Sequence, residues 1–379
     1  MKRVMWSIAI ISLATVLGTS CNSSGHDDTV SDSSSITTNS DNAAKSTDLK
    51  PKGEDPAWGP DIDDEMLVVM EKLQSYGDKP IETLSAAEAR RQHTPTDAVM
   101  DVMSEHSIPM PPPMVDTMGK DIPVAGGNIH ARIYTPKTSD SSYPVIVYYH
   151  GGGWVIADLN VYDASARSLA EQTGAVVVSV HYRQGPENKF PTAHNDAFAA
   201  YQWVLKNAAS LKGNPKLVAV AGESAGGNLA CNVSIMARDK GIMMPVHQIL
   251  VYPVANNDMN SESYQKYAAA KPLNKPMMEW FATNYLGDMS KAADPRISLV
   301  KANLKGLPST TIIAAEIDPL MTEGKMLADK LKDAGVTVDY KLYNGVVHEF
   351  FGMATVVPDA KDAQALAAGN LKNAFGNAR

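Results

Sequence analysis

The residue whose surroundings most clearly suggest chemistry is Ser224, at the centre of Gly222-Glu-Ser-Ala-Gly226. An apolar run at 217–221 precedes this motif, and a helical pattern of small residues follows it, which predicts strand, sharp turn and helix. A side chain at position 222 or 226 would collide with the neighbouring strand or helix, and glycine removes that collision. A serine at the apex of such a turn is exposed as a nucleophile.

A serine hydroxyl needs a base to take its proton, and the base is usually a histidine held by a carboxylate. Among the nine histidines, His348 stands out because it follows a predicted strand, where loops converge over the serine. Asp318 also follows a strand, whereas its rival Glu316 is still at the strand end. The chain order Ser224, Asp318, His348 is the order of the triad in α/β-hydrolases.

A run of three glycines, 151–153, directly follows the apolar strand 145–149. Attack on an ester carbonyl places negative charge on its oxygen, and backbone N–H groups aimed there stabilise it. The N–H groups of Gly152 and Gly153 can supply this oxyanion hole together with that of Ala225. A flexible turn is the simpler interpretation of the glycines, but the serine motif makes it the less favoured one.

Strands must alternate with helices for these loops to meet. Because they do, the sequence predicts a mostly parallel sheet covered by helices on both faces, an α/β fold. The expected strands are 128–134, 145–149, 175–182, 217–221, 248–252, 310–315 and 336–343, and the expected helices include 162–173, 192–208, 320–334 and 359–376.

Composition narrows the function classes. Hydrophobic residues make up 44% and charged residues 20%, as in a globular protein. The net charge of −8 argues against nucleic-acid binding, which needs clustered Lys and Arg. The two cysteines, Cys21 and Cys231, cannot form a disulfide framework, and no Cys/His cluster has zinc spacing.

The first residues have the pattern of an export signal. Lys2 and Arg3 precede an apolar segment, 4–17, and small residues lead to Cys21. We interpret 1–20 as a lipoprotein-like signal peptide with Cys21 as the mature N-terminus, so that a lipid on Cys21 would attach an exported protein to the bacterial cell envelope. Ordinary cleavage after Ser20, giving a periplasmic protein, is the alternative, and membrane partitioning of a Cys21→Ala variant would distinguish them. The polar segment 22–55 is predicted to be a disordered tether.

Several long motifs occur in the order typical of one family. The chain resembles the hormone-sensitive-lipase-like bacterial carboxylesterases of the α/β-hydrolase superfamily between about residues 117 and 352. The motifs are His150-Gly-Gly-Gly-Trp-Val-Ile156, His181-Tyr-Arg-Gln-Gly-Pro-Glu187, Phe190-Pro-Thr-Ala-His-Asn-Asp196, Gly222-Glu-Ser-Ala-Gly-Gly-Asn-Leu229, Asp318-Pro-Leu320, Glu323-Gly324, Ala334-Gly-Val336 and His348.

The resemblance implies an α/β-hydrolase fold and hydrolysis of short-chain acyl esters without metal or cofactor. It assigns Ser224 as nucleophile, Asp318 as acid and His348 as base. It also implies a helical cap made of residues 56–116 and an insertion at about 255–300 within a catalytic domain at 117–379.

The chain departs from the family pattern at three places. Glu223 precedes the serine where Asp or Thr is usual, Glu349 follows His348 where Gly is usual, and Met321-Thr322 replaces Arg-Asp. Each departure affects the surroundings of the triad without removing a catalytic group.

Two other functions use the same fold. An amidase, or a deacetylase of acylated sugars or drugs, would share the triad, and the cap would decide between them and an esterase. A non-catalytic ligand-binding protein is the third alternative, and His348 argues against it because receptors that resemble this family lack the catalytic histidine. A panel of acyl esters and amides would discriminate these functions, while the oligomeric state stays open.

Overall fold

The computed structural model describes residues 49–138 and 140–378, so the expected signal peptide and Cys21 lie outside the described residues. The described part contains an eight-stranded sheet in the order β1-β2-β4-β3-β5-β6-β7-β8. The pairs β1–β2 and β2–β4 are antiparallel and all other neighbours are parallel. The strands are β1 (Val115–Val124), β2 (Gly127–Pro136), β3 (Tyr143–Tyr149), β4 (Val176–His181), β5 (Gly213–Glu223), β6 (Gln248–Val251), β7 (Thr310–Ile317) and β8 (Val338–Val347).

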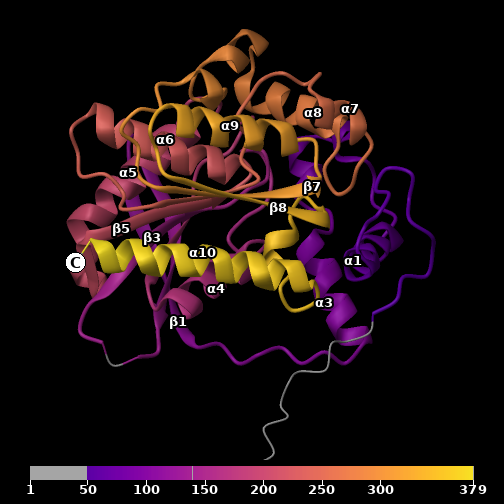
Figure 1. Cartoon of the computed structure of the whole chain (residues 1–379), viewed down its shortest axis with the longest axis horizontal. Coiled ribbons are helices and arrows are strands. Elements are labelled where there is room, and N and C mark those ends of the chain that lie inside the picture. Colours follow the sequence, from indigo (N-terminus) through magenta and orange to yellow (C-terminus); the bar gives the residue numbers. More distant parts are fainter. Residues whose placement is uncertain (1–48, 139, 379) are drawn as a thin grey trace, which may run out of the picture. The chain divides into compact units, whose positions relative to one another are not determined.

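Helices cover both faces of this sheet (Figure 1). On one face lie α4 (Asp163–Thr173) and α10 (Pro358–Asn377), which contact each other. On the other lie α5 (Thr192–Asn207), α6 (Ala225–Asp239) and α9 (Met321–Asp333). The predicted α/β-hydrolase class, a mostly parallel sheet between two layers of helices, is therefore confirmed.

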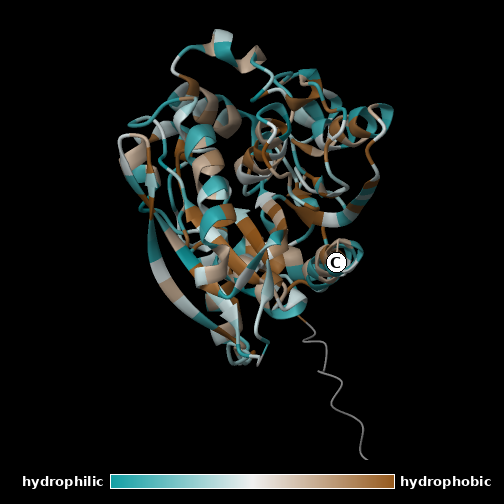
Figure 2. Cartoon of the chain, turned by 90° about the vertical axis from the view of Figure 1, so that its left-hand side faces the viewer, coloured by the Kyte–Doolittle hydropathy of each residue, from teal (hydrophilic) through white to brown (hydrophobic). Residues whose placement is uncertain are grey.

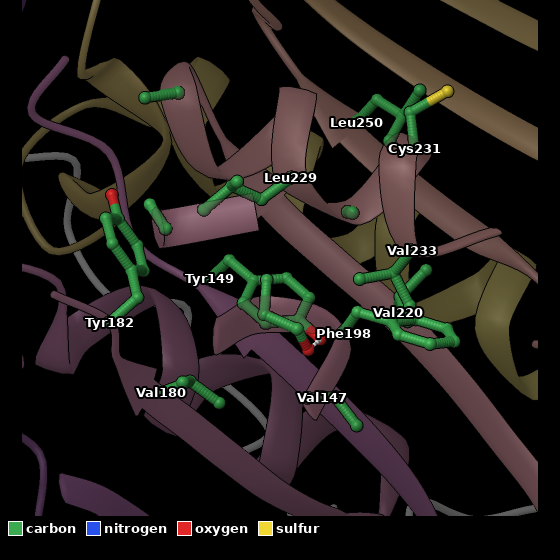
Figure 3. Close-up of a cluster of buried hydrophobic side chains, with 14 of the residues drawn as sticks. Val147, Tyr149, Val180, Tyr182, Phe198, Val220, Leu229, Cys231, Val233 and Leu250 are labelled. Atoms are coloured by element: carbon green, nitrogen blue, oxygen red, sulfur yellow. Dashed lines mark hydrogen bonds between the residues drawn. The ribbon is translucent and has the colours of Figure 1, made fainter. Parts of the chain in front are cut away.

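Apolar residues on successive positions of β3 explain why the sheet needs both layers. Val147 and Tyr149 contribute to the core under α5 and α6, whereas Ile146 and Tyr148 contribute to the core under α4 and α10. Side chains alternate across a strand, so a continuous apolar run must be buried on both faces. Figure 2 shows apolar colouring concentrated along the central strands, and Figure 3 shows Tyr149 beside Leu229 and other members of the first core.

The predicted elements match the structure apart from some of their ends. The expected strands did not include β1, which spans Val115–Val124 and pairs with β2. Strand β8 begins two residues later than predicted and runs on to Val347, four residues beyond Tyr343. His348 therefore follows the strand directly. The turn Asn344-Gly345, with φ +68° at Gly345, had suggested an earlier end.

In the described part of the chain, three α-helices precede the sheet: α1 (Asp64–Ser75), α2 (Ala86–Ala89) and α3 (Pro95–Glu105). Ser85 caps α2 together with Glu88 in a capping box. Residues 49–53 fall within the segment 22–55 that was expected to be a tether, yet they pack on the fold. Leu49 is buried, and the Glu71 carboxylate accepts hydrogen bonds from the N–H groups of Lys52 and Gly53. These contacts belong to residues 49–53, whose polar neighbours had suggested a tether.

The segment between β6 and β7 carries two further helices, α7 (Glu262–Lys266) and α8 (Lys275–Leu286). The Trp280 indole of α8 donates a hydrogen bond of 3.0 Å to the Leu84 carbonyl, just before α2. The loop after β6 and the N-terminal helices are therefore joined, although almost 200 residues separate them in the chain. Within the described residues, no helix is long and apolar enough to cross a membrane.

Arg90, at the end of α2, attaches this N-terminal region to the rest of the fold. Its guanidinium donates to the carbonyls of Val155 at 2.8 Å and Gly185 at 2.5 Å. The same guanidinium forms two hydrogen bonds to the carboxylate of Glu187, which is about half exposed. An exposed ion pair contributes little to the free energy of unfolding, whereas a carbonyl that loses a charged hydrogen-bond donor lowers it by more.

We predict that Arg90→Ala lowers the free energy of unfolding by about 1–3 kcal/mol because two carbonyls lose their charged donor. Glu187→Gln should lower it by less than about 1 kcal/mol because it removes only the exposed ion pair. Urea unfolding of the two variants measures the difference. Equal losses in both would mean that the ion pair, and not the carbonyl bonds, provides the attachment.

Candidate active site

Ser224 occupies the turn between β5 and α6 in a strained backbone conformation, with φ +55° and ψ −118°. A Cβ atom on Gly222 would lie 2.2 Å from the Gly226 carbonyl oxygen, and one on Gly226 would lie 1.9 Å from that of Tyr149. The steric role predicted for both glycines is therefore present: position 222 is closed by the helix and position 226 by the neighbouring strand. Non-glycine residues with positive φ are uncommon and cluster at functional sites.

The glycines after β3 form a tight loop beside Ser224. Gly152 and Gly153 have φ values of +89° and +58°. Their N–H groups donate to no acceptor within the described chain. Ala225 is the first residue of α6, where a helix leaves its N–H groups without intrahelical partners. The three predicted oxyanion donors therefore belong to two backbone segments that meet at the ends of β3 and β5, which are neighbours in the sheet.

His348 and Asp318 form a buried pair. Nδ1 of His348 lies 2.7 Å from Oδ2 of Asp318, and both side chains are almost fully inaccessible to solvent. The other carboxylate oxygen of Asp318 accepts a hydrogen bond from the Leu320 N–H at 2.8 Å. Burial alone would lower the pKa of His348, but the Asp318 carboxylate outweighs it and holds the pKa above its usual value.

The rival carboxylate lies elsewhere. Glu316 accepts a hydrogen bond from the Gly345 N–H at 3.1 Å and lies 4.0 Å from Lys266. It is still part of β7, whereas Asp318 follows the strand and so reaches the sheet edge where His348 lies. The structure thus brings Asp318, and not Glu316, to the histidine.

A cavity of about 870 Å³ opens above these residues. Ser224, His348, Gly152 and Gly153 line its floor, so the proposed nucleophile, base and oxyanion donors face one space. The other walls come from residues between 70 and 95, between 154 and 184 and between 254 and 297. Within the described residues, no group of three or more His, Cys, Asp or Glu side chains could hold a metal ion.

Two carboxylates with tyrosine partners, the buried Glu223 and the partly exposed Glu349, lie beside the pair, and sequence reasoning identified these acids but not the tyrosines. Glu223 accepts hydrogen bonds from the hydroxyls of Tyr148, at 2.5 Å, and Tyr252. Burial raises the pKa of Glu223 to about 7, with a contribution from the charge of Glu349. Glu349 accepts from the Tyr162 hydroxyl at 2.5 Å. Of the three tyrosines, Tyr148 could have been recognised from the sequence, because its hydroxyl needs a hydrogen-bond partner in a strand that is buried on both faces.

The fold agrees with comparisons to known proteins. A profile of the family described as "alpha/beta hydrolase fold" matches residues 146–352, more than half of the chain. The protein belongs to the α/β-hydrolase family. It is similar to carboxylesterase NlhH of Mycobacterium tuberculosis, with 37% identity over 252 residues, which cover 65% of this chain and 79% of the relative. It is also 31% identical over 294 residues to ethyl acetate hydrolase of Pseudomonas putida, covering 75% and 88%.

Solved structures place this α/β-hydrolase in the same group. The hyperthermophilic esterase from the archeon Pyrobaculum calidifontis is similar, with a TM-score of 0.74 and 34% identity, covering 81% of this chain and 97% of that one. The resemblance to the hormone-sensitive-lipase-like carboxylesterases is thereby confirmed, and the protein is a carboxylesterase of this group.

We predict that Asp318→Asn lowers kcat on an ester substrate by several orders of magnitude, about 10⁴-fold in the best-known triad, because the histidine loses the carboxylate that orients it. Glu316→Gln, which removes an equal charge from the same strand end, should change kcat by less than about threefold, because its contacts are to the Gly345 backbone and Lys266. Steady-state kinetics of both variants provide the measurement. An inactive Glu316→Gln enzyme with an active Asp318→Asn enzyme would reverse the assignment.

Proposed function

We propose that this α/β-hydrolase is a serine carboxylester hydrolase that acts on short-chain acyl esters through an acyl-enzyme intermediate. The observation that carries the proposal is the buried Asp318–His348 pair, with Nδ1 and Oδ2 2.7 Å apart, facing the same cavity as Ser224. A histidine held in this way has its other nitrogen, Nε2, free for a proton from a serine hydroxyl.

In the first half of the proposed reaction, His348 Nε2 takes the proton of Ser224 Oγ as Oγ attacks the ester carbonyl carbon. The carbonyl oxygen becomes an oxyanion, and the N–H groups of Gly152, Gly153 and Ala225 donate to it. Asp318 stabilises the resulting imidazolium without taking its proton. The imidazolium then protonates the alcohol oxygen as its bond to carbon breaks, which leaves the acyl group on Ser224.

In the second half, a water molecule takes the place of the alcohol. His348 removes one proton from this water as its oxygen attacks the acyl carbon, and the same oxyanion donors stabilise the second tetrahedral intermediate. Return of the proton to Ser224 Oγ releases the carboxylic acid and restores the enzyme. The cycle consumes one ester and one water and needs no further reactant.

We propose that the segments containing α2 and α8 act as the cap of this site. Their residues line the cavity above Ser224, and the bond from Trp280 to Leu84 joins them. The Phe281 ring of α8 lies against the glycine loop at 151–153, here called the oxyanion loop. A Cβ atom on Gly153 would be 2.3 Å from that ring. Phe281 thus bounds the space next to the reacting carbonyl and limits the length of the acyl chain.

We predict that Ser224→Ala leaves the fold intact and lowers turnover of an acyl ester by about 10⁴–10⁶-fold, because the nucleophile is lost. Covalent labelling by an organophosphate should occur in the parent enzyme and be absent from the variant. Ser261→Ala, in the loop before α7, serves as the matched control with near-normal turnover. Near-normal hydrolysis by purified Ser224→Ala protein would refute the mechanism. Faster hydrolysis of amides than of esters by the parent enzyme would favour an amidase.

We predict that kcat/KM for p-nitrophenyl esters peaks at short acyl chains, about two to six carbons, and then falls. Each buried methylene contributes about 0.8 kcal/mol only while the cavity has room, and overpacking then outweighs the gain. Phe281→Leu should move the maximum to longer chains, whereas Phe198→Leu, in the core away from the cavity, should not. A maximum at long chains in the parent enzyme, or activation at an oil–water interface, would contradict this prediction.

A further inference from the structure

Glu349 has a backbone conformation that disfavours its side chain. The residue follows His348 with φ +74° and ψ −1°, in the left-handed region. Glycine adopts this region freely, whereas other residues do so at a cost and mostly where the surrounding structure has a use for them. We therefore expect the carboxylate of Glu349 to have a role at this position.

The carboxylate of Glu349 bridges two parts of the site. It accepts a hydrogen bond of 2.5 Å from the hydroxyl of Tyr162, at the start of α4. That hydroxyl packs against the oxyanion loop, because a Cβ atom on Gly151 would lie 2.2 Å from it. Glu349 also lines the cavity together with Ser224 and His348. The loop that carries the histidine is thus tied to the loop that carries the oxyanion donors.

Three carboxylates and one aromatic ring face His348. Asp318, after β7, is in direct contact with the imidazole. The negative charges of Glu349 and of Glu223, at the end of β5, also raise the pKa of His348. The Tyr252 ring, after β6, packs on it with ring centroids 4.4 Å apart. Glu223 is bonded to two tyrosine hydroxyls, Tyr148 and Tyr252, and burial raises its pKa to about 7, so much of it is neutral at that pH.

The pKa of Glu349 is subject to opposing effects. Burial raises its pKa, but His348 and the bond from Tyr162 act in the opposite direction. The negative form of Glu349 therefore favours the protonated form of His348, and the reverse also holds. This is the relation expected of an ion pair that forms when the histidine takes a proton.

We propose that Glu349 is a positioning residue for the proposed esterase reaction, a second carboxylate that, held by Tyr162, stabilises the protonated form of His348. The proposal rests on the proposed function, in which His348 gains a proton in each half of the reaction. Asp318 orients the ring through Nδ1, and Glu349 adds charge from the cavity side without taking a proton. The left-handed backbone is the cost of placing that charge next to the base.

The pH dependence of kcat/KM tests this role, because its acid limb reports protonation of the free enzyme's base. A nearby negative charge favours the protonated imidazole, so its removal lets His348 lose its proton at lower pH. Glu349→Gln, a neutral isostere that can still accept from Tyr162, should move the acid limb down by about half to one pH unit. Glu349→Gly, which suits the backbone, should move it in the same direction and covers the case in which the Gln variant folds poorly.

Tyr162 offers an independent check. Tyr162→Phe removes the bond that favours the charged form of Glu349, so it should shift the acid limb in the same direction but by less. The double variant Glu349→Gln with Tyr162→Phe should show the same limb as Glu349→Gln alone, because the tyrosine acts on the base only through the carboxylate.

Asp258→Asn is the matched control. Asp258 also lines the cavity but is exposed and bonds only to the Asn260 N–H, so its loss removes one charge without moving the limb. An unshifted limb in both Glu349 variants, with activity reduced equally at all pH values, would overturn the proposal and leave Glu349 as a structural residue. Full activity of Ser224→Ala would instead refute the proposed function itself, so the two failures are distinguishable.

Discussion

The close contact between the first turn of α6 and the end of β3 constrains every other part of the active site. Only glycine at position 226 lets the helix approach, since any Cβ atom there would overlap the Tyr149 carbonyl. This approach places Ser224 at the N-terminus of α6 and next to the loop that follows β3. Because β3 and β5 pair in parallel with Tyr149 opposite Gly222, Ser224 and the glycines at 151–153 leave the sheet at the same level. Their separation thus depends on strand pairing and not on the flexibility of either loop.

Burial of acidic groups is the second condition of the site. Water is largely excluded around His348, so charge on any of the surrounding carboxylates is unfavourable unless a donor or a cation compensates it. Asp318 has a backbone N–H and the histidine, Glu223 has two tyrosine hydroxyls, and Glu349 has one. In the proposed mechanism, the imidazolium of His348 is the cation that these groups share. An environment that disfavours isolated charge is therefore arranged to accept one specific proton transfer.

In the proposed mechanism, the reacting groups and the cavity walls that would select the substrate belong to different parts of the chain. Ser224, His348 and the oxyanion loop all follow strands of the rigid sheet. The opposite walls of the cavity come from two segments, at 70–95 and 254–297, that are held by a few directional contacts such as those of Arg90 and Trp280. Substitutions in these segments can change the shape of the cavity while the reacting groups keep their geometry.

The sequence by itself determined the sheet class and most elements, and it singled out the three residues that the structure brings to one edge, because apolar periodicity and glycine sterics act over a few residues. It also identified Glu223 and Glu349 as unusual. The sequence favoured Asp318 over Glu316, and the tertiary structure brings Asp318 to His348 because Asp318 lies just beyond β7 whereas Glu316 is still within the strand. Only the tertiary structure paired Glu349 with Tyr162, 187 residues earlier in the chain. A hydrogen bond across that separation leaves no period or motif in the sequence, because it depends on how α4 and the loop after β8 pack on the same sheet.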